Sequence, residues 1–150
     1  LSVGGFRGME AEVDLEPLWL RSNQACRWCF PRVEDRELSF YCPRSEKDFA
    51  ANSWKILEPI PERSEKVAVN ELHMIVVPAV AFDRQGRRLG MGKGFYDRVL
   101  AKSSALSIGV CYGEQLSEEL LPFEAHDQPV DGLITENFTL WPVRNEAQVS

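Results

Sequence analysis

The clearest structural element of the sequence reads Met74-Ile75-Val76-Val77-Pro78-Ala79-Val80-Ala81-Phe82. Apolar residues occupy both alternations of this run, which is typical of a strand that is covered on both faces. Pro78 is expected to end the strand proper, because proline cannot donate a hydrogen bond to a ladder. A glycine-rich turn follows, and residues 95–102 then predict a helix. The stretch therefore predicts a strand–turn–helix unit of an α/β fold.

Further elements are predicted on both sides of this unit. Strands are predicted at residues 2–7, 25–30, 38–41, 106–112 and 130–135, with an edge strand at 138–141. Pro31 and Pro43 are expected to end the second and third of these strands. Helices are predicted from Asp14 and Pro17 onward and at 117–121, and residues 63–70 are typical of a solvated loop. The alternation of strands and helices predicts a three-layer, Rossmann-like α/β domain with a mostly parallel central sheet and helices on both faces.

Length and composition exclude several classes of protein. The 150 residues are 44% hydrophobic and 27% charged, which favours one folded domain over residues 1–150 and excludes a disordered chain. No apolar run approaches the ~18–20 residues of a membrane span. The net charge of −6 argues against a general nucleic-acid binder. We expect a monomer whose residues 142–150 form a tail.

The cysteines and the first residues bear on the compartment. Leu1 opens the chain, and no basic segment followed by an apolar one marks a signal peptide. Four cysteines are too few for a disulfide scaffold, so we expect all four to be reduced in a cytoplasmic protein. The Cys26–Cys29 pair has CxxC spacing, but it lies within a predicted strand, and we interpret it as structural.

The turn before the predicted helix is rich in glycine and basic residues. It reads Arg88-Leu89-Gly90-Met91-Gly92-Lys93-Gly94-Phe95-Tyr96-Asp97-Arg98. Ligands of open parallel sheets bind beyond the carboxyl ends of the strands, where this turn lies. Glycines let backbone N–H groups approach a phosphate, and a helix start adds free N–H groups and a positive dipole end.

Local charge points to an anionic ligand as well. Residues 84–102 hold six basic side chains and one acid, within a chain of net charge −6. Lys93 suits a phosphate, and Asp97, four residues on, suits the accompanying Mg²⁺. The segment matches neither G-x-x-x-x-G-K-[ST] nor G-x-G-x-x-G, and a plain glycine turn with solvated arginines stays open as an alternative.

The glycine segment resembles the signature R-L-G-x-G-x-G-[YF]-Y-D-R of the 5-formyltetrahydrofolate cyclo-ligases. Further likenesses extend over residues 3–136. They are Glu12-Val13-Asp14, Phe30-Pro31-Arg32-Val33, Ser53-Trp54-Lys55-Ile56 with Glu58-Pro59, the run from Val77 to Asp83, and His126-Asp127 with Val130-Asp131 and Thr135-Glu136. The resemblance implies a ligase that uses ATP and Mg²⁺ to cyclise 5-formyltetrahydrofolate to 5,10-methenyltetrahydrofolate through a phosphorylated formyl oxygen.

The resemblance also implies roles for individual residues. Lys93 and Tyr96 are the candidate catalytic residues, and Asp97 and Asp127 the candidate Mg²⁺ ligands. Glu12 would bond the edge of the pterin, Trp54 and Tyr96 would pack against the folate rings, and Met91 would line the formyl end. ATP would be held by Arg88, Leu89, Gly90, Met91, Gly92, Lys93, Gly94, Phe95 and Tyr96.

Two departures from the family pattern occur. Phe95 stands where the family often has tyrosine, and the chain begins near the strand that follows the family's N-terminal helix, so we expect that helix to be absent. The alternatives are a non-catalytic folate- or nucleotide-binding remnant, an RNA-associated module and a sugar-phosphate isomerase. The acidic charge and the lack of an aromatic RNP pattern disfavour RNA, and an isomerase needs no ATP.

Overall fold

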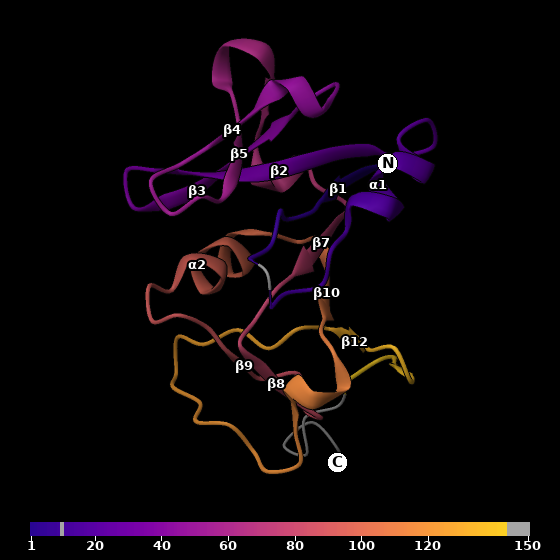
Figure 1. The fold of residues 1–150 in the computed structure, drawn as a ribbon. Coiled ribbons are helices and arrows are strands. Elements are labelled where there is room, and N and C mark those ends of the chain that lie inside the picture. Colours follow the sequence, from indigo (N-terminus) through magenta and orange to yellow (C-terminus); the bar gives the residue numbers. More distant parts are fainter. Residues whose placement is uncertain (10, 144–150) are drawn as a thin grey trace.

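A large, mostly parallel sheet organises the molecule (Figure 1). The computed structural model describes residues 1–9 and 11–143, in which eight strands form one sheet in the order β13-β12-β10-β7-β1-β2-β3-β6. Their bounds are β1 Ser2–Gly4, β2 Arg27–Glu34, β3 Glu37–Cys42, β6 Glu65–Val67, β7 Met74–Val77, β10 Leu106–Val110, β12 Gly132–Ile134 and β13 Thr139–Leu140. The five strands β12, β10, β7, β1 and β2 are parallel to one another, whereas β13 pairs antiparallel with β12, β3 with β2 and β6 with β3.

Shorter elements flank this sheet. The described residues also hold a three-stranded sheet (β8 Ala81–Asp83, β9 Arg88–Leu89, β11 Leu116–Ser117) and a two-stranded hairpin (β4 Phe49–Ala51, β5 Leu57–Pro59). The α-helices are α1 Glu16–Ser22 and α2 Phe95–Lys102, and the 3-10 turns are η1 Glu46–Asp48, η2 Pro61–Arg63, η3 Val69–Glu71 and η4 Gly113–Gln115. These elements confirm the mixed α/β class.

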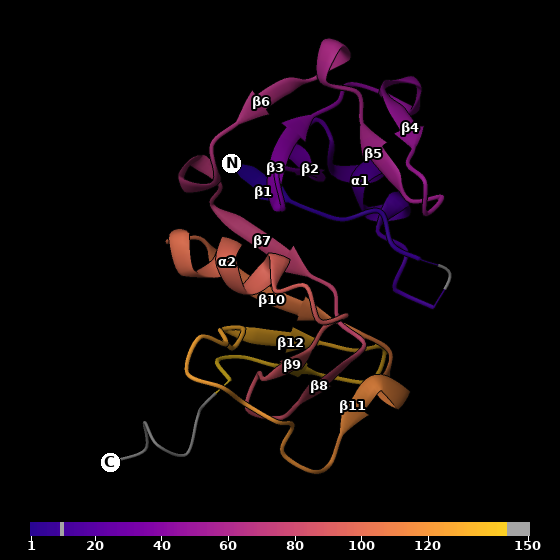
Figure 2. The ribbon, with the colours of Figure 1, turned by 90° about the vertical axis from the view of Figure 1, so that its left-hand side faces the viewer.

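The two helices pack against different parts of the core. Val99 of α2 belongs to the same buried cluster as Ile75 and Val77 of β7, and α2 lies beside β7 and β10 in both ribbon views (Figures 1 and 2). Trp19 of α1 belongs to a second cluster with Val76. Successive side chains of a strand point to opposite faces, so β7 supplies both clusters, as its doubly apolar sequence predicts.

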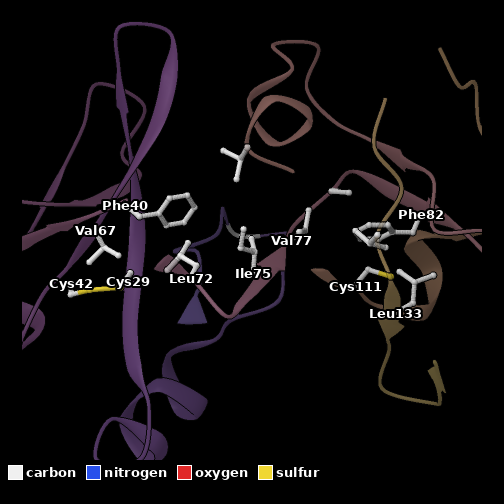
Figure 3. Close-up of a cluster of buried hydrophobic side chains, with 13 residues drawn as sticks. Cys29, Phe40, Cys42, Val67, Leu72, Ile75, Val77, Phe82, Cys111 and Leu133 are labelled. Carbon is white, nitrogen blue, oxygen red and sulfur yellow. A yellow bond between two sulfur atoms is a disulfide. The ribbon is translucent and has the colours of Figure 1, made fainter. Parts of the chain in front are cut away.

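The first cluster extends along the sheet to the small sheet that carries the glycine segment. Figure 3 shows it running from Val67 and Phe40 through Ile75 to Phe82 and Leu133. Phe82 packs over β10 at Gly109, where a Cβ atom would lie 2.7 Å from the phenyl ring. The absence of a side chain at Gly109 thus allows β8 to dock closely, and β8 in turn positions β9.

Several predicted elements are confirmed at their ends. Pro78 separates β7 from β8, α2 spans the predicted residues 95–102, and β13 is an antiparallel edge strand. Asp14 accepts a hydrogen bond from Glu16 N–H (3.0 Å) at the start of α1.

Pro31, by contrast, does not end β2, which continues to Glu34. The backbone groups of Arg27 and Cys29 bond on the β1 side, and Pro31 faces the same side by alternation. Since β1 ends at Gly4, the missing N–H of Pro31 costs no ladder hydrogen bond. The prediction was wrong because it ignored how far the neighbouring strand reaches.

Three more local predictions were wrong. Residues 117–121 form no helix, because the Ser117 hydroxyl closes a turn by bonding both N–H and C=O of Glu119. The predicted loop at 63–70 contains β6, whose pairing partner β3 lies more than twenty residues away in sequence. Strand β1 is also shorter than predicted and ends at Gly4.

The expectation that all cysteines are reduced was wrong for two of them. Cys29 and Cys42 form a disulfide between β2 and β3, while Cys26 and Cys111 are free. The antiparallel register explains the pairing. Phe30 lies opposite Tyr41, so Cys29 lies opposite Cys42. The CxxC cysteines are thus not paired with each other.

Among residues 1–9 and 11–143 no helix is long and apolar enough to cross a membrane. Residues 144–150 of the predicted tail lie outside the described residues. Val143 packs against the core, and its N–H donates a hydrogen bond to Asp131 O (2.8 Å).

Candidate functional site

The glycine segment connects β9 to α2 through two left-handed glycines. Gly92 has φ +89° and Gly94, the N-cap of α2, has φ +68°, a region that L side chains rarely adopt. No side chain caps α2, so its first N–H groups are available to a ligand. This backbone can receive an anion at the helix start.

Arg88 is the buried cation beside this helix start. Its side chain is only 9% exposed, donates to Pro78 O (3.3 Å) and lies 3.9 Å from Asp97 Oδ1. Burial lowers the pKa of Arg88, although Asp97, Tyr96, Asp127 and Glu12 act in the opposite direction. Its Nε has no hydrogen-bond partner within the described residues. A buried cation with an unused donor suits an anionic ligand.

Tyr96 lies against Arg88 at the second position of α2. The guanidinium carbon is 5.4 Å from the phenol ring centroid. Burial raises the pKa of Tyr96 well above its ordinary value, the effect of Arg88 notwithstanding. The phenol therefore stays protonated at neutral pH and can donate a hydrogen bond.

Two carboxylates approach the same place from distant parts of the chain. Asp97 on α2 accepts a hydrogen bond from Gln128 N–H (3.1 Å), which makes Asp127 its near neighbour. Asp127 accepts from Glu124 N–H (2.7 Å), and His126 Nε2 lies 3.4 Å from its Oδ1.

These carboxylates fit a magnesium ion better than a closed metal cage. No group of three or more His, Cys, Asp or Glu side chains converges among the residues that the structure describes. Mg²⁺ is commonly held by one or two carboxylates, with water and phosphate oxygens filling its other positions. The pair Asp97 and Asp127 matches that donor set.

Glu12 lines a cavity that is formed by residues of the N-terminal half of the chain. The cavity of about 310 Å³ is lined by Arg7, Gly8, Met9, Glu12, Val13, Asp14, Lys55 and Leu57. Glu12 Oε1 accepts Met9 N–H (2.7 Å), which fixes the carboxylate at the end of a tight turn. The charge of Glu12 raises the pKa of both Arg88 and Tyr96, so the carboxylate acts electrostatically on the buried cation.

Trp54 and Lys93 lie close to each other on the surface of the protein. Trp54 lies at the tip of the β4–β5 hairpin, where Asn52 Oδ1 accepts the N–H groups of Trp54 (2.8 Å) and Ile56 (3.1 Å). The indole is 76% exposed, and Lys93 Nζ lies 5.9 Å from its ring centroid. Met91 is exposed on the glycine segment and is not among the residues that line the Glu12 cavity.

The chain is similar in sequence to proteins of one known family. The model described as the 5-formyltetrahydrofolate cyclo-ligase family matches residues 13–136. The chain belongs to the 5-formyltetrahydrofolate cyclo-ligase family. The cyclo-ligase of Escherichia coli K12 is 30% identical over 141 residues, which cover 89% of this chain and 77% of the relative. That of Haemophilus influenzae is 42% identical over 119 residues, which cover 77% of this chain and 63% of the relative.

Solved structures agree with the cyclo-ligase assignment. The NMR structure of Aquifex aeolicus 5,10-methenyltetrahydrofolate synthetase is similar with a TM-score of 0.81 and 36% identity, covering 99% of this chain and 75% of that chain. A 5,10-methenyltetrahydrofolate synthetase from Mycoplasma pneumoniae is similar with a TM-score of 0.62 and 25% identity, covering 88% and 70%.

Some residues around the candidate site of this cyclo-ligase were not singled out from the sequence. Arg7 and Lys55 line the Glu12 cavity, and Gln128 bonds Asp97. No local signal marks Arg7 or Gln128, because both act through contacts with distant segments. Lys55 follows Trp54 in a motif that the sequence does show, and its positive φ of 62° comes from the tight turn around Asn52.

Proposed function

We propose that this chain catalyses the ATP-dependent cyclisation of 5-formyltetrahydrofolate to 5,10-methenyltetrahydrofolate, with release of ADP and phosphate. The observation that carries the proposal is the grouping of Arg88, Tyr96 and Asp97 at an uncapped helix start, with Gln128, the residue after Asp127, bonded to Asp97, in a cyclo-ligase that also holds the Glu12 cavity. One side of this arrangement suits phosphates and the other suits a folate ring.

The reaction transfers a phosphoryl group and then expels it. The formyl oxygen attacks the γ-phosphorus while the bond to the bridging β–γ oxygen breaks and ADP leaves. N10 then attacks the formyl carbon, its proton is lost, and the C–O bond breaks to release phosphate. A phosphate leaves far more readily than a formamide oxygen, which is why the enzyme needs ATP.

The chain's own residues supply position and charge for these steps. Arg88, Lys93 and the N–H groups of Gly90 to Tyr96 would neutralise and orient the phosphates, and protonated Tyr96 would donate to the reacting formyl group. Asp97 and Asp127 would hold Mg²⁺, which supplies charge stabilisation to phosphoryl transfer when bound. Glu12 would bond the pterin edge, while Trp54 and Tyr96 would pack its rings and Met91 would line the formyl end.

The direct test is the appearance of methenyltetrahydrofolate absorbance from 5-formyltetrahydrofolate, with and without Mg·ATP. We expect product only when Mg·ATP is present, with ADP formed in equal amount. Product formation without ATP, or ATP binding with no product, would contradict the proposal, and the latter would favour the non-catalytic remnant.

Several finer predictions accompany this function. We propose that the chain is a single, three-layer, Rossmann-like domain, that it is monomeric, and that it works in the cytoplasm. Sedimentation equilibrium with and without Mg·ATP measures the oligomeric state, and a dimer at micromolar concentration would contradict the monomer.

A further inference from the structure

The strand that follows Pro78 ends in a buried carboxylate with no part in the chemistry above. Asp83 is 1% exposed and lies at the end of β8. Its Oδ1 accepts the N–H groups of Gln85 (2.9 Å) and Arg87 (3.0 Å), and its Oδ2 accepts Leu121 N–H (2.9 Å). It forms no salt bridge within the described residues, so backbone N–H groups alone stabilise its charge.

These three bonds join two segments that are far apart in sequence. Gln85 and Arg87 belong to the β8–β9 turn, which leads directly into Arg88. Leu121 belongs to the segment between β11 and β12, residues 118–131, which we call the Asp127 loop. One carboxylate therefore holds the strand of the buried cation and the loop of the candidate metal ligand at a fixed spacing.

Other contacts between the turn and the Asp127 loop support the same junction. Val130 N–H donates to Gly86 O (2.9 Å) at one end of the loop. The Arg87 guanidinium lies 4.8 Å from the Phe123 ring centroid and donates to Leu121 O (3.5 Å) near the other end. The loop has no helix or strand of its own between these points. The contacts at its ends therefore help to place Asp127, together with the hydrogen bond from Gln128 N–H to Asp97.

We propose that Asp83 is a positioning residue, which sets the spacing of Arg88 and Asp127 by binding the backbone of Arg87 and Leu121 with one side chain. The inference rests on the proposed function, because the spacing matters for the Mg·ATP half of the site. Asp83 makes no contact with the Glu12 cavity. We therefore expect its effect on the KM for Mg·ATP and not on the KM for 5-formyltetrahydrofolate.

Three variants separate this role from a merely structural one. Asp83→Asn keeps the size of the side chain but replaces one acceptor oxygen by a donor. Glu58→Gln is the matched control, since Glu58 is 8% exposed and accepts the backbone N–H of Val33 (2.9 Å) outside the junction. Arg87→Met removes the contacts to Phe123 and Leu121 without orphaning a buried acceptor of Asp83.

The measurement is the KM for Mg·ATP and for 5-formyltetrahydrofolate in each variant, with amide hydrogen exchange of the Asp127 loop. Asp83→Asn should raise the KM for Mg·ATP about tenfold, leave the folate KM unchanged and speed exchange at Gln128 and Val130. Arg87→Met should act in the same direction by a smaller factor. Glu58→Gln should lower Tm but leave both KM values unchanged.

Failure of the inference on Asp83 and failure of the proposed function give different results. An unchanged KM for Mg·ATP in Asp83→Asn, or an equal rise for both substrates, overturns the inference. If Asp83→Asn does not fold, Arg87→Met decides by the same criterion. If the wild-type chain makes no product, the proposed function fails, and calorimetric Mg·ATP affinities of the same variants decide on Asp83: equal affinities, or no binding by the wild type, overturn the inference.

Discussion

Lys93 is the candidate catalytic residue whose substitution should least disturb the fold. It is exposed, it forms no salt bridge in the described part of the chain, and its Nζ lies 5.9 Å from the Trp54 ring centroid. Lys93→Met should lower kcat by a factor of about 10²–10³, because one preorganised charge on the transferring phosphoryl is lost. The free energy of unfolding should change by no more than about 0.5 kcal/mol.

Another exposed lysine that lies over an aromatic ring, and that also pairs with Glu34 (3.4 Å), provides the control for this prediction. Lys66 Nζ lies 5.8 Å from the Tyr41 ring centroid, far along the sheet from the glycine segment. Lys66→Met should leave kcat unchanged. An unchanged kcat in Lys93→Met, measured by stopped-flow absorbance, would remove Lys93 from phosphoryl transfer.

The buried thiol of Cys111 should make the free energy of unfolding depend on pH in the alkaline range. Burial raises the pKa of its thiol from 9.0 to about 11. The unfolded thiol therefore loses its proton from about pH 9 upward while the folded thiol keeps it, so stability is full below that pH and falls as the pH rises toward the folded value. Urea unfolding at about pH 8 and about pH 10.5 should show this loss.

Substitution separates this thiol from other alkaline groups. Cys111→Ala should reduce the difference in unfolding free energy between the two pH values, and Tyr96, whose pKa is also raised by burial, should account for part of what remains. Cys26→Ala should leave the difference as in the wild type. A difference that is identical in Cys111→Ala would show that the Cys111 thiol does not cause it.

At the scale of elements, two glycines with positive φ allow backbone strain to be separated from steric clash as the cost of adding a side chain. Gly86 in the β8–β9 turn has φ +79°, and a Cβ there would lie 2.6 Å from Val130 O. Gly92 has φ +89°, but nothing lies within 4 Å of its Cβ position. Gly92→Ala should therefore cost about 1 kcal/mol of strain alone.

Gly86→Ala adds a backbone clash to the same strain. The clash cannot be relieved by rotating a side chain, so Gly86→Ala should cost at least about 2 kcal/mol more than Gly92→Ala. Urea unfolding of both variants at neutral pH gives the two losses. Equal losses would mean that the β8–β9 turn moves freely away from Val130.

Elements were predictable from sequence where local signals decide them. The bounds of α2 follow from Gly94 before it and from an apolar face within it, and Pro78 marks the end of β7. The course of β2 past Pro31, the pairing of β6 and the Cys29–Cys42 disulfide depend on strands that meet from distant parts of the chain, and no local pattern encodes them.

The candidate site shows the same division. Arg88, Tyr96 and Asp97 lie within one motif, so their proximity follows from the sequence of the β9–α2 turn. Asp127 and Glu12 look like ordinary surface acids by themselves, and only the family resemblance singled them out. Asp83 was visible as the end of a motif, but its three backbone partners depend on the path of the Asp127 loop.

At the scale of the whole molecule, the proposed pterin contact and the proposed phosphate-binding segment come from different halves of the chain. Glu12 lines the cavity from the N-terminal half, whereas the glycine segment and Asp127 belong to the C-terminal half. Glu12→Gln should raise the KM for 5-formyltetrahydrofolate about tenfold through loss of a charged hydrogen bond, with the KM for Mg·ATP unchanged.

A neighbouring acid controls for the change in charge. Glu16 pairs with Arg7 (3.4 Å) but does not line the cavity, so Glu16→Gln should leave both KM values unchanged. Steady-state kinetics with each substrate varied in turn gives the four constants. An unchanged folate KM in Glu12→Gln would remove Glu12 from pterin recognition.

The position of Trp54 gives the protein an optical signal of its own. Trp19 and Trp28 are buried, whereas Trp54 is among the most exposed side chains and lies at the rim of the site. In a Trp141→Phe background, which removes the other exposed indole, adding 5-formyltetrahydrofolate should quench the red-shifted fluorescence and shift it to shorter wavelength. Trp54→Phe in that background should abolish the change, and a change that persists would place the folate elsewhere. A single exposed indole thus makes occupancy of the folate side measurable by emission before any turnover takes place.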